Sequence, residues 1–232
     1  MKPQVIYLVR HGESHGNADQ SLYKHTPDWK IELTEKGHEQ AKKAAHELYQ
    51  DIKSVKDHHH LSNVYSSAYR ASTAMFYSSP WIRARQTAVH LNEPFGAKIY
   101  EDPRLREQEW GNYAEDQFIK KIARERKKFG SFFYRMPYGE SGADVYDRVT
   151  SFLDTLYRDF AKDDFPLTAV IVSHGLTIKS FIMRWFHESA EDFDAYKTPK
   201  NCEILKMVLG SNNKYTLVTP LRKRATKCST KM

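Results

Sequence analysis

Cysteine is scarce in this chain of 232 residues, which holds only Cys202 and Cys228. Two cysteines are too few for a framework of disulfide bonds, and neither has the spacing of a zinc ligand. A reducing compartment fits this usage best. The composition therefore excludes a small disulfide-stapled fold and gives no sign of a cysteine-based metal centre.

Long apolar runs are also missing. The run at residues 5–9 is too short for the apolar region of a secretory signal, and no segment approaches the ~20 apolar residues of a membrane span. We therefore expect a soluble, cytoplasmic protein. The C-terminal Thr230-Lys231-Met232 distantly resembles the peroxisomal Ser-Lys-Leu signal, although its first and last residues differ, and it leaves peroxisomal import as an alternative.

Acidic residues are absent from residues 222–232, which carry five of the 36 basic residues. The whole chain has a formal net charge of +7, with 29 acidic residues. Without this segment 31 basic residues face 29 acidic ones, a net charge of +2. The rest of the chain is nearly neutral, so nucleic acid is not an expected partner. We expect a single domain over residues 1–221 with no internal linker, followed by a flexible basic tail over 222–232.

Apolar periodicity predicts strands and helices that alternate along the chain. Strands are expected over 5–9, 75–78, 169–173, 203–209 and 215–219, and helices over 35–48, 86–92, 116–128, 142–160 and 176–186. This alternation is typical of an α/β fold built around one sheet.

A His-Gly pair follows closely after two of the expected strands. Residues 5–9 are followed by Arg10-His11-Gly12, and residues 169–173 are followed by His174-Gly175. Open α/β sheets bind ligands beyond the carboxyl ends of their strands. We therefore expect Arg10, His11 and His174 to share one pocket. A guanidinium beside an imidazole favours recognition of phosphate and phosphoryl transfer through histidine.

Another arginine and a carboxylate extend this expected pocket. Pro80 predicts the first turn of a helix and so places Arg83 near the helix N-terminus, where backbone N–H groups favour anions. Arg70 follows a similar Tyr-Ser-Ser sequence without the proline, and Arg83 is preferred for that reason. Glu107 and Glu109 stand in one loop, and either can supply a proton donor.

These motifs resemble those of the histidine phosphatase superfamily, the phosphoglycerate-mutase-like group, whose hallmark is Arg-His-Gly near the N-terminus. The resemblance runs from about Val5 to Glu203 and includes residues 33–41 and 137–141. It implies a three-layer α/β fold, with a mostly parallel sheet and helices on both faces. It also implies roles for individual residues: His11 as the phosphorylated nucleophile, Arg10, Arg83 and His174 as the phosphate pocket, and Glu107, which directly follows the Leu-Xaa of the family pattern, as the proton donor.

The chemistry of phosphoryl transfer sets requirements for these side chains. His11 must be neutral at its reacting nitrogen, so an acceptor such as a backbone carbonyl must hold the hydrogen on the other nitrogen. Arg10, Arg83 and a cationic His174 stabilise the charge of the transition state, so we expect no metal ion and no cofactor. Asn17 has two possible roles, to bind the phosphate through its amide or to cap the loop.

Within the group, we expect a phosphomonoesterase that acts on small phosphorylated metabolites and resembles the broad-range acid phosphatases. Mutases of the group have Glu-Arg-His-Tyr-Gly where this chain has Glu107-Gln108-Glu109-Trp110-Gly111, and His-Gly-Asn where it has His174-Gly175-Leu176. Both differences remove polar or cationic ligands. Two alternatives remain open. One is a phosphoglycerate mutase or sugar-bisphosphate phosphatase that uses Lys120, Lys121, Arg124 and Arg126 for a second phosphate, and the other is a non-catalytic phosphate-binding scaffold.

Overall fold

A six-stranded sheet forms the middle layer of the computed structural model, which describes residues 2–58, 74–111 and 116–224. Its strands lie in the order β3-β2-β4-β1-β5-β6. They are β1 (Val5–Arg10), β2 (Met75–Ser78), β3 (Ile99–Glu101), β4 (Thr168–Ser173), β5 (Ile204–Leu209) and β6 (Tyr215–Leu217). The first four in this order are parallel, β5 is antiparallel to β1, and β6 is antiparallel to β5.

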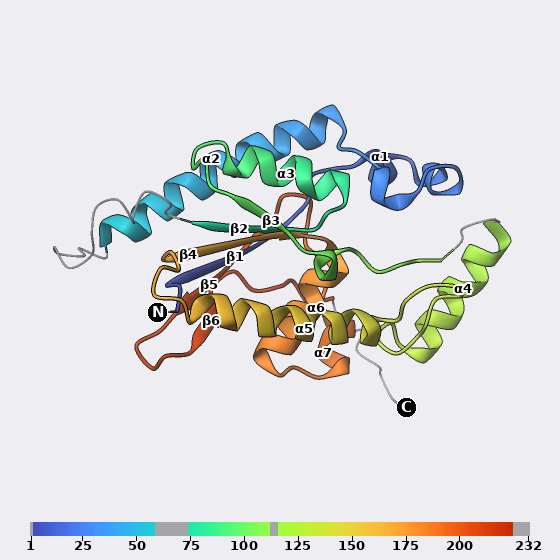
Figure 1. The fold of residues 1–232 in the computed structure, drawn as a ribbon. Helices are drawn as coiled ribbons and strands as arrows, with labels where there is room; N and C mark the ends of the chain where they lie inside the picture. Colours follow the sequence, from blue (N-terminus) through green and yellow to red (C-terminus); the bar gives the residue numbers. More distant parts are fainter. Residues whose placement is uncertain (1, 59–73, 112–115, 225–232) are drawn as a thin grey trace.

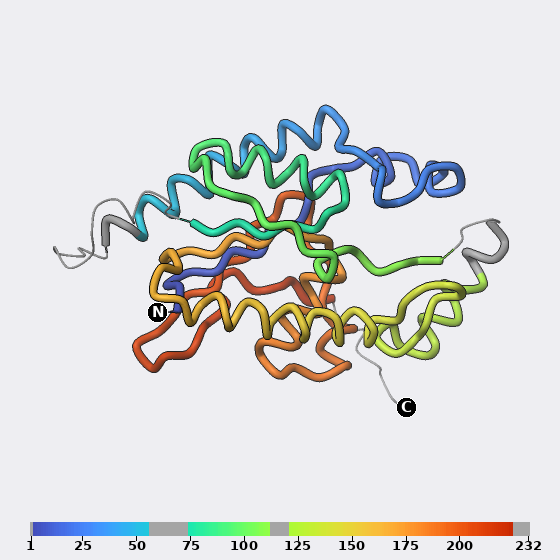
Figure 2. Tube along the Cα trace, in the orientation of Figure 1, coloured from blue at the N-terminus to red at the C-terminus, as the bar shows by residue number. Residues whose placement is uncertain are grey.

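Helices cover both faces of the sheet, as Figure 1 shows, and this arrangement confirms the expected fold class. On one face lie α2 (Glu35–His58) and α3 (Ile82–Asn92), and on the other lie α5 (Gly142–Phe160), α6 (Gly175–Phe186) and α7 (Ala190–Ala195). Two further helices, α1 (His15–Ala18) and α4 (Asp116–Phe129), lie at one end of the molecule, as the tube in Figure 2 also shows.

The position of β1 inside the sheet explains why its residues 5–9 are all apolar. Ile6 and Leu8 of β1 belong to the core under α5 and α6, whereas Val5, Tyr7 and Val9 belong to the core under α2 and α3. Successive side chains of a strand point to opposite faces of the sheet. A parallel strand covered on both faces therefore carries apolar residues at every position rather than at every second one.

Some elements differ from the sequence-based expectation. Helix α2 continues to His58 because Ile52 stays buried against the sheet, although charged residues around it hide the apolar stripe. Helix α3 begins at Ile82, as expected from Pro80. Strand β3 and helix α7 were not expected, since β3 has only three residues and α7 only six, too few for a periodic pattern.

The parallel strands deliver three segments to one edge of the sheet. Arg10 of β1 pairs with Ser173 of β4, and Ser78 of β2 pairs with Val172, so the residues that follow these strands leave the sheet side by side. The segment after β1 then packs directly on the start of α2. A Cβ on Gly12 would lie 2.6 Å from the carbonyl oxygen of Gly37, so this approach requires glycine.

The C-terminal basic segment begins inside the folded structure. Arg224 donates its backbone N–H to Ala195 O at 2.8 Å, and Arg222 O accepts from Lys197 N at 2.7 Å. Lys223 pairs with Tyr196 in an isolated antiparallel bridge. The described chain is therefore held against α7 through Arg224, beyond the expected boundary at 221. Residues 225–232 of the expected tail lie outside the described residues.

Candidate active site

His11 follows β1 and is held in one orientation by the backbone. Its Nδ1 lies 2.7 Å from Gly12 O, which can only accept, so Nδ1 carries the hydrogen and Nε2 carries the lone pair. Arg83 Nε donates to this Nε2 at 3.3 Å. Burial, and then the guanidinium groups of Arg83 and Arg10, hold the pKa of His11 well below its usual value. The imidazole is therefore neutral, with a defined reactive nitrogen.

Arg83 lies in the first turn of α3 and is 3% exposed. Its Nη1 donates to Asp28 Oδ1 and to Asp28 O, both at 2.7 Å, and its guanidinium stacks on Trp81 with 4.8 Å to the ring centroid. Asp28 was not expected from the sequence, because a carboxylate in a short 3₁₀ turn carries no recognisable motif. The ion pair keeps the Arg83 charge compensated when no ligand is bound.

Arg10 reaches the same space from the end of β1. Its Nη1 donates to Pro199 O at 2.7 Å, which anchors one side of the guanidinium. Its Nε is buried and has no hydrogen-bond partner among the described residues. A buried donor without a partner costs free energy, so this N–H is a position at which an anionic oxygen would be stabilised.

His174 packs behind His11 rather than in the cavity wall. The two ring centroids are 5.0 Å apart, and His174 Nε2 lies 2.8 Å from Ser79 Oγ. Its side chain is fully buried, and its Nδ1 has no partner among the described residues. Burial, and then Arg83 and His11, hold its pKa well below the usual value. A cationic His174 stays a prediction for the phosphate-bound site, and burial and the Arg83 guanidinium oppose the protonation that it requires.

Glu107 approaches the site from the loop before α4. Its Oε2 accepts from Leu176 N at 3.4 Å, at the N-terminus of α6, and its Oε1 accepts from Gln108 N at 3.0 Å. Glu109 is exposed instead and pairs with Arg106 at 3.4 Å. Of these two carboxylates, only Glu107 lines the cavity.

A buried ion pair shapes the backbone that carries Glu107. Arg148 on α5 donates to the carbonyl oxygens of Arg104, Arg106 and Glu107 at 2.6–3.1 Å. The same guanidinium binds both oxygens of Glu140, at 3.0 and 3.1 Å. Glu140 also accepts from Glu109 N at 3.0 Å. Arg148 and Glu140 are positioning residues, and the Gly-Glu-Ser segment noted in the sequence acts through the loop rather than on the ligand.

Asn17 serves the loop after β1 and also lines the cavity. Its Oδ1 accepts from Ser14 N at 3.2 Å, within the capping box of α1, and from Asn201 Nδ2 at 3.1 Å. Asn201 Nδ2 donates in addition to His11 O at 3.0 Å. Asn17 therefore has the expected capping role. Its Oδ1 is used in these contacts, so only its amide NH₂ group is left to donate to a ligand.

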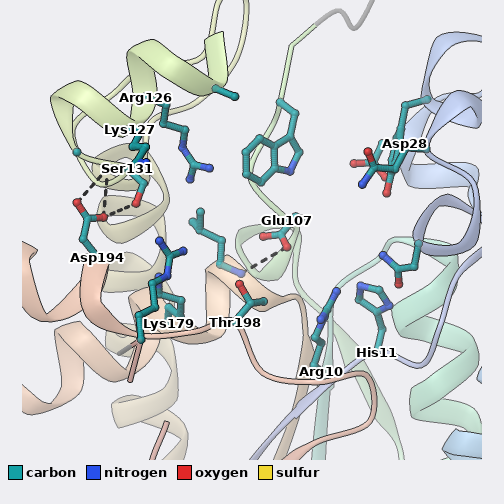
Figure 3. A pocket seen from close by; sticks show the side chains of 18 of the residues that line it. Arg10, His11, Asp28, Glu107, Arg126, Lys127, Ser131, Lys179, Asp194 and Thr198 are labelled. Atoms are coloured by element: carbon teal, nitrogen blue, oxygen red, sulfur yellow. Dashed lines mark hydrogen bonds between the residues drawn. The ribbon is translucent and has the colours of Figure 1, made fainter. Parts of the chain in front are cut away.

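One cavity of about 770 Å³ is lined by Arg10, His11, Asn17, Arg83 and Glu107, and it is shown in Figure 3. Basic residues outnumber acidic ones in its wall. The basic residues are Arg10, Arg83, Arg126, Lys127, Lys179 and Arg224, and the acidic residues are Asp28, Glu107 and Asp194. Such a lining favours an anionic ligand.

The structure thus brings together most of the residues singled out in the sequence. Arg10, His11, Asn17, Arg83 and Glu107 line the cavity, and His174 supports it from behind. Of the four basic residues considered for a second phosphate, Arg126 lines the cavity, whereas Lys121 and Arg124 do not, and the side chain of Lys120 lies outside the described residues. Arg70, the rejected counterpart of Arg83, lies outside them too.

Lys179, Asp194 and Arg224 were missed as cavity residues. Lys179 alone had a detectable signal, since a lysine between Ile178 and Phe181 interrupts the apolar face of an otherwise buried helix.

Two further properties concern the described part of the chain. It contains no cluster of three or more His, Cys, Asp or Glu side chains arranged to hold a metal ion. None of its helices combines the length and apolar character needed to cross a membrane.

Known proteins share the family and the fold of this chain. The family model described as histidine phosphatase superfamily (branch 1) matches residues 6–219. The chain is 41% identical over 225 residues to the phosphoglycerate mutase-like protein AT74 of Arabidopsis thaliana, covering 93% of this chain and 68% of that protein. It is 29% identical to the broad-range acid phosphatase DET1 of Saccharomyces cerevisiae, covering 96% and 90%. A solved mycobacterial glucosyl-3-phosphoglycerate phosphatase in complex with VO3 has the same fold, with a TM-score of 0.68, 22% identity and coverage of 92% and 96%.

The Arg148–Glu140 pair generates a prediction about stability. Arg148→Met leaves three buried loop carbonyls without this donor and leaves Glu140 with only Arg106 Nη2 and Glu109 N, and we expect it to lower the free energy of unfolding by ~3–5 kcal/mol. Arg158→Met, an exposed arginine on the same helix, should change it by less than about 0.5 kcal/mol. Urea unfolding of both variants, of Glu140→Met, and of the double variant Arg148→Met with Glu140→Met measures the coupling between the two residues. Strictly additive losses in the double variant would contradict this role for the pair.

Proposed function

The chain belongs to the histidine phosphatase superfamily (branch 1), and on this premise we propose that it is a metal-independent phosphomonoesterase acting through a phosphohistidine at His11. The observation that carries the proposal is the state of His11. Its Nδ1–H is held by Gly12 O, and its Nε2 carries the lone pair, which accepts a long hydrogen bond of 3.3 Å from Arg83 Nε in a cavity lined by Arg10 and Arg83. This is the protonation state that a nucleophilic imidazole requires.

In the first step, His11 Nε2 attacks phosphorus while the bond from phosphorus to the ester oxygen breaks. The departing alkoxide takes a proton from the Glu107 carboxyl group, which becomes a carboxylate. Arg10 and Arg83 donate to the phosphoryl oxygens, whose negative charge is spread over the transition state. The buried Nε of Arg10 gains the partner it lacks in the unliganded protein.

In the second step, the Glu107 carboxylate takes a proton from water as the water oxygen attacks phosphorus. The Nε2–P bond breaks, inorganic phosphate forms, and His11 and protonated Glu107 are regenerated. Splitting one displacement into two lowers the barrier of a reaction that enzymes accelerate by as much as ~10²¹-fold.

His174 responds to the charge of the substrate in this scheme. Its pKa is low because the imidazole is buried and because the guanidinium groups of Arg83 and Arg10 lie near it. A bound phosphate dianion offsets these charges and raises that pKa, which favours protonation of Nδ1, the nitrogen that is unpartnered in the unliganded protein. Binding of the dianion and protonation of His174 are therefore coupled.

The names of the relatives support phosphatase and mutase chemistry alike, and two positions favour hydrolysis. Gln108 is fully buried and donates to Glu140 O at 2.5 Å, so it faces the protein interior rather than the ligand. Leu176 places an apolar side chain in the cavity wall. A released product therefore finds few ligands at the positions where mutases of the group carry Arg, His and Asn.

The nucleophile is tested by trapping. We expect wild-type protein given a ³²P-labelled monoester and quenched at alkaline pH to carry acid-labile label on His11, in the presence of a chelator as in its absence. His11→Ala should carry none and release no phosphate. Label on His174, activity retained by His11→Ala, or loss of wild-type activity on chelation would each contradict the proposal. Phosphate binding without turnover by the wild type would favour a scaffold instead.

The proton donor is tested by changing the leaving group. Glu107→Gln should lower kcat for an alkyl phosphate by ~10²–10⁴-fold, and much less for a nitrophenyl phosphate, whose leaving group needs no proton. Glu109→Gln is the matched control, two residues along the same loop, and should change little because its side chain lies outside the cavity. The opposite ranking of the two variants would overturn the assignment.

Mutase activity is the second candidate, and the basic residues at the far side of the cavity favour it. A mutase holds its product until the phosphoryl group returns, whereas a phosphatase admits water first. We expect 3-phosphoglycerate supplied with catalytic 2,3-bisphosphoglycerate to yield free phosphate faster than the 2-phospho isomer. Isomer formation that outpaces phosphate release would favour the mutase.

A further inference from the structure

The cavity has a second basic region that the proposed reaction does not use. Figure 3 shows Arg126, Lys127 and Lys179 on one side of the cavity and Arg10 and His11 on the other, with Glu107 and Thr198 between them. These basic residues come from α4 and α6. Arg224, from the segment after β6, also lines the cavity.

Lys179 is the most unusual member of this region. Its side chain is 5% exposed, yet it lines the cavity from the second turn of α6. Its only described contact of a polar kind is with the face of Phe193, 4.1 Å from Nζ to the ring centroid. Among the described residues it has neither a hydrogen bond nor an ion pair. A buried ammonium group without an acceptor is costly, and a bound anionic oxygen would remove this cost.

The charged side chains around Lys179 also favour the binding of an anion. Asp194 on α7 is the acidic side chain that acts most strongly on Lys179, but its carboxylate already accepts from the backbone N–H and hydroxyl of Ser131. Arg126 stacks on Trp110, 4.8 Å from its ring centroid, which fixes the guanidinium at the cavity wall. Lys179, Arg126 and Arg224 thus share this region with two carboxylates, Glu107 and Asp194, of which Asp194 is already engaged by Ser131.

We propose that Lys179, Arg126 and Arg224 form a second anion subsite that binds a carboxylate or phosphate group carried by the same substrate whose phosphoryl group faces His11. One continuous cavity holds both regions, so one molecule can reach both. The proposal rests on the proposed function, because it takes the His11 end as the phosphoryl end. It names the substrate class as phosphate monoesters that bear a second anionic group.

The second anion subsite differs from the phosphoryl pocket because Lys179, unlike an arginine, loses its charge at moderately alkaline pH. Burial, and then Arg224, lower the pKa of Lys179 to about 8, with Arg126 acting in the same direction and Asp194 and Glu107 opposing it. A bound anion raises this pKa. Lys179 is charged below about pH 8, so the second anion binds most tightly there, and its affinity falls as the pH rises through this value.

Binding of phosphonates tests the subsite without relying on turnover, because their P–C bond is not hydrolysed. Alkylphosphonates of three to six methylene groups are compared by calorimetry with the same compounds carrying a terminal carboxylate or a terminal phosphonate. We expect the second anion to tighten binding to wild-type protein by about tenfold or more at its best chain length. The best terminal group distinguishes a carboxylate from a phosphate site. Equal affinity for plain and charged probes at every length would overturn the proposal.

Substitutions test which residues produce this gain in affinity. Lys179→Met keeps the length of the side chain without its charge, and Arg126→Ala removes the stacked guanidinium; both should bring the affinity ratio of charged to plain probe close to one. Lys179→Arg should restore the ratio. Lys128→Ala, an exposed lysine two residues from Arg126 and outside the cavity wall, should leave it unchanged. Thermal unfolding confirms that each variant is folded. A wild-type ratio in folded Lys179→Met would refute the assignment.

Proton uptake separates Lys179 from the histidines. At pH 8.5, calorimetry in buffers of different ionisation enthalpy should show more protons taken up with the charged probe than with the plain one. Proton uptake by His174 is common to both probes and cancels in the difference. The difference should vanish in Lys179→Arg, and its persistence there would count against the proposal. Failure of the proposed function appears elsewhere, as the absence of label on His11, so the two failures are distinguishable.

Discussion

The site depends on the confinement of several basic side chains at the buried carboxyl edge of the sheet. Arg83 donates to His11, His11 packs against His174, and Arg10 is close enough to lower the pKa of both histidines. Each of the four is stabilised in a different way. Arg83 is paired with Asp28, Arg10 is anchored to Pro199 O, and both histidines have lowered pKa values. Like charges so close together are tolerated because the imidazoles give up their protons while the guanidinium groups keep theirs.

Much of this edge could be predicted from the sequence. Strand-forming runs that end in His-Gly locate His11 and His174 at the same edge, because parallel strands bring their carboxyl ends together. Pro80 fixes the start of α3 and hence the place of Arg83. These signals are local, since each depends on a strand or a helix that its own residues specify.

The features of the site that could not be predicted depend on contacts between segments far apart in the sequence. Asp28 meets Arg83 across 55 positions, and Arg148 reaches the Glu107 loop across about forty. No periodicity or motif near Asp28 or Arg224 indicates a role at the cavity. His174 was placed at the correct edge of the sheet, whereas the lowering of its pKa by burial and Arg83 could not be predicted, because a pKa depends on the three-dimensional neighbourhood. The same reason explains why Lys179, in the middle of a buried helix, was not connected with Arg126.

The ion pair between Asp28 and Arg83 has a consequence for selectivity. A ligand shares the guanidinium with a carboxylate that is already bonded to Nη1 at 2.7 Å and that neutralises part of its charge. Chloride and other abundant monovalent ions offer a single charge and replace one such contact at best. A doubly charged oxyanion presents several oxygens, so it engages Arg83 and the open Nε of Arg10 together. Partial neutralisation of Arg83 by Asp28 therefore weakens the attraction for small monovalent ions more than that for a doubly charged oxyanion.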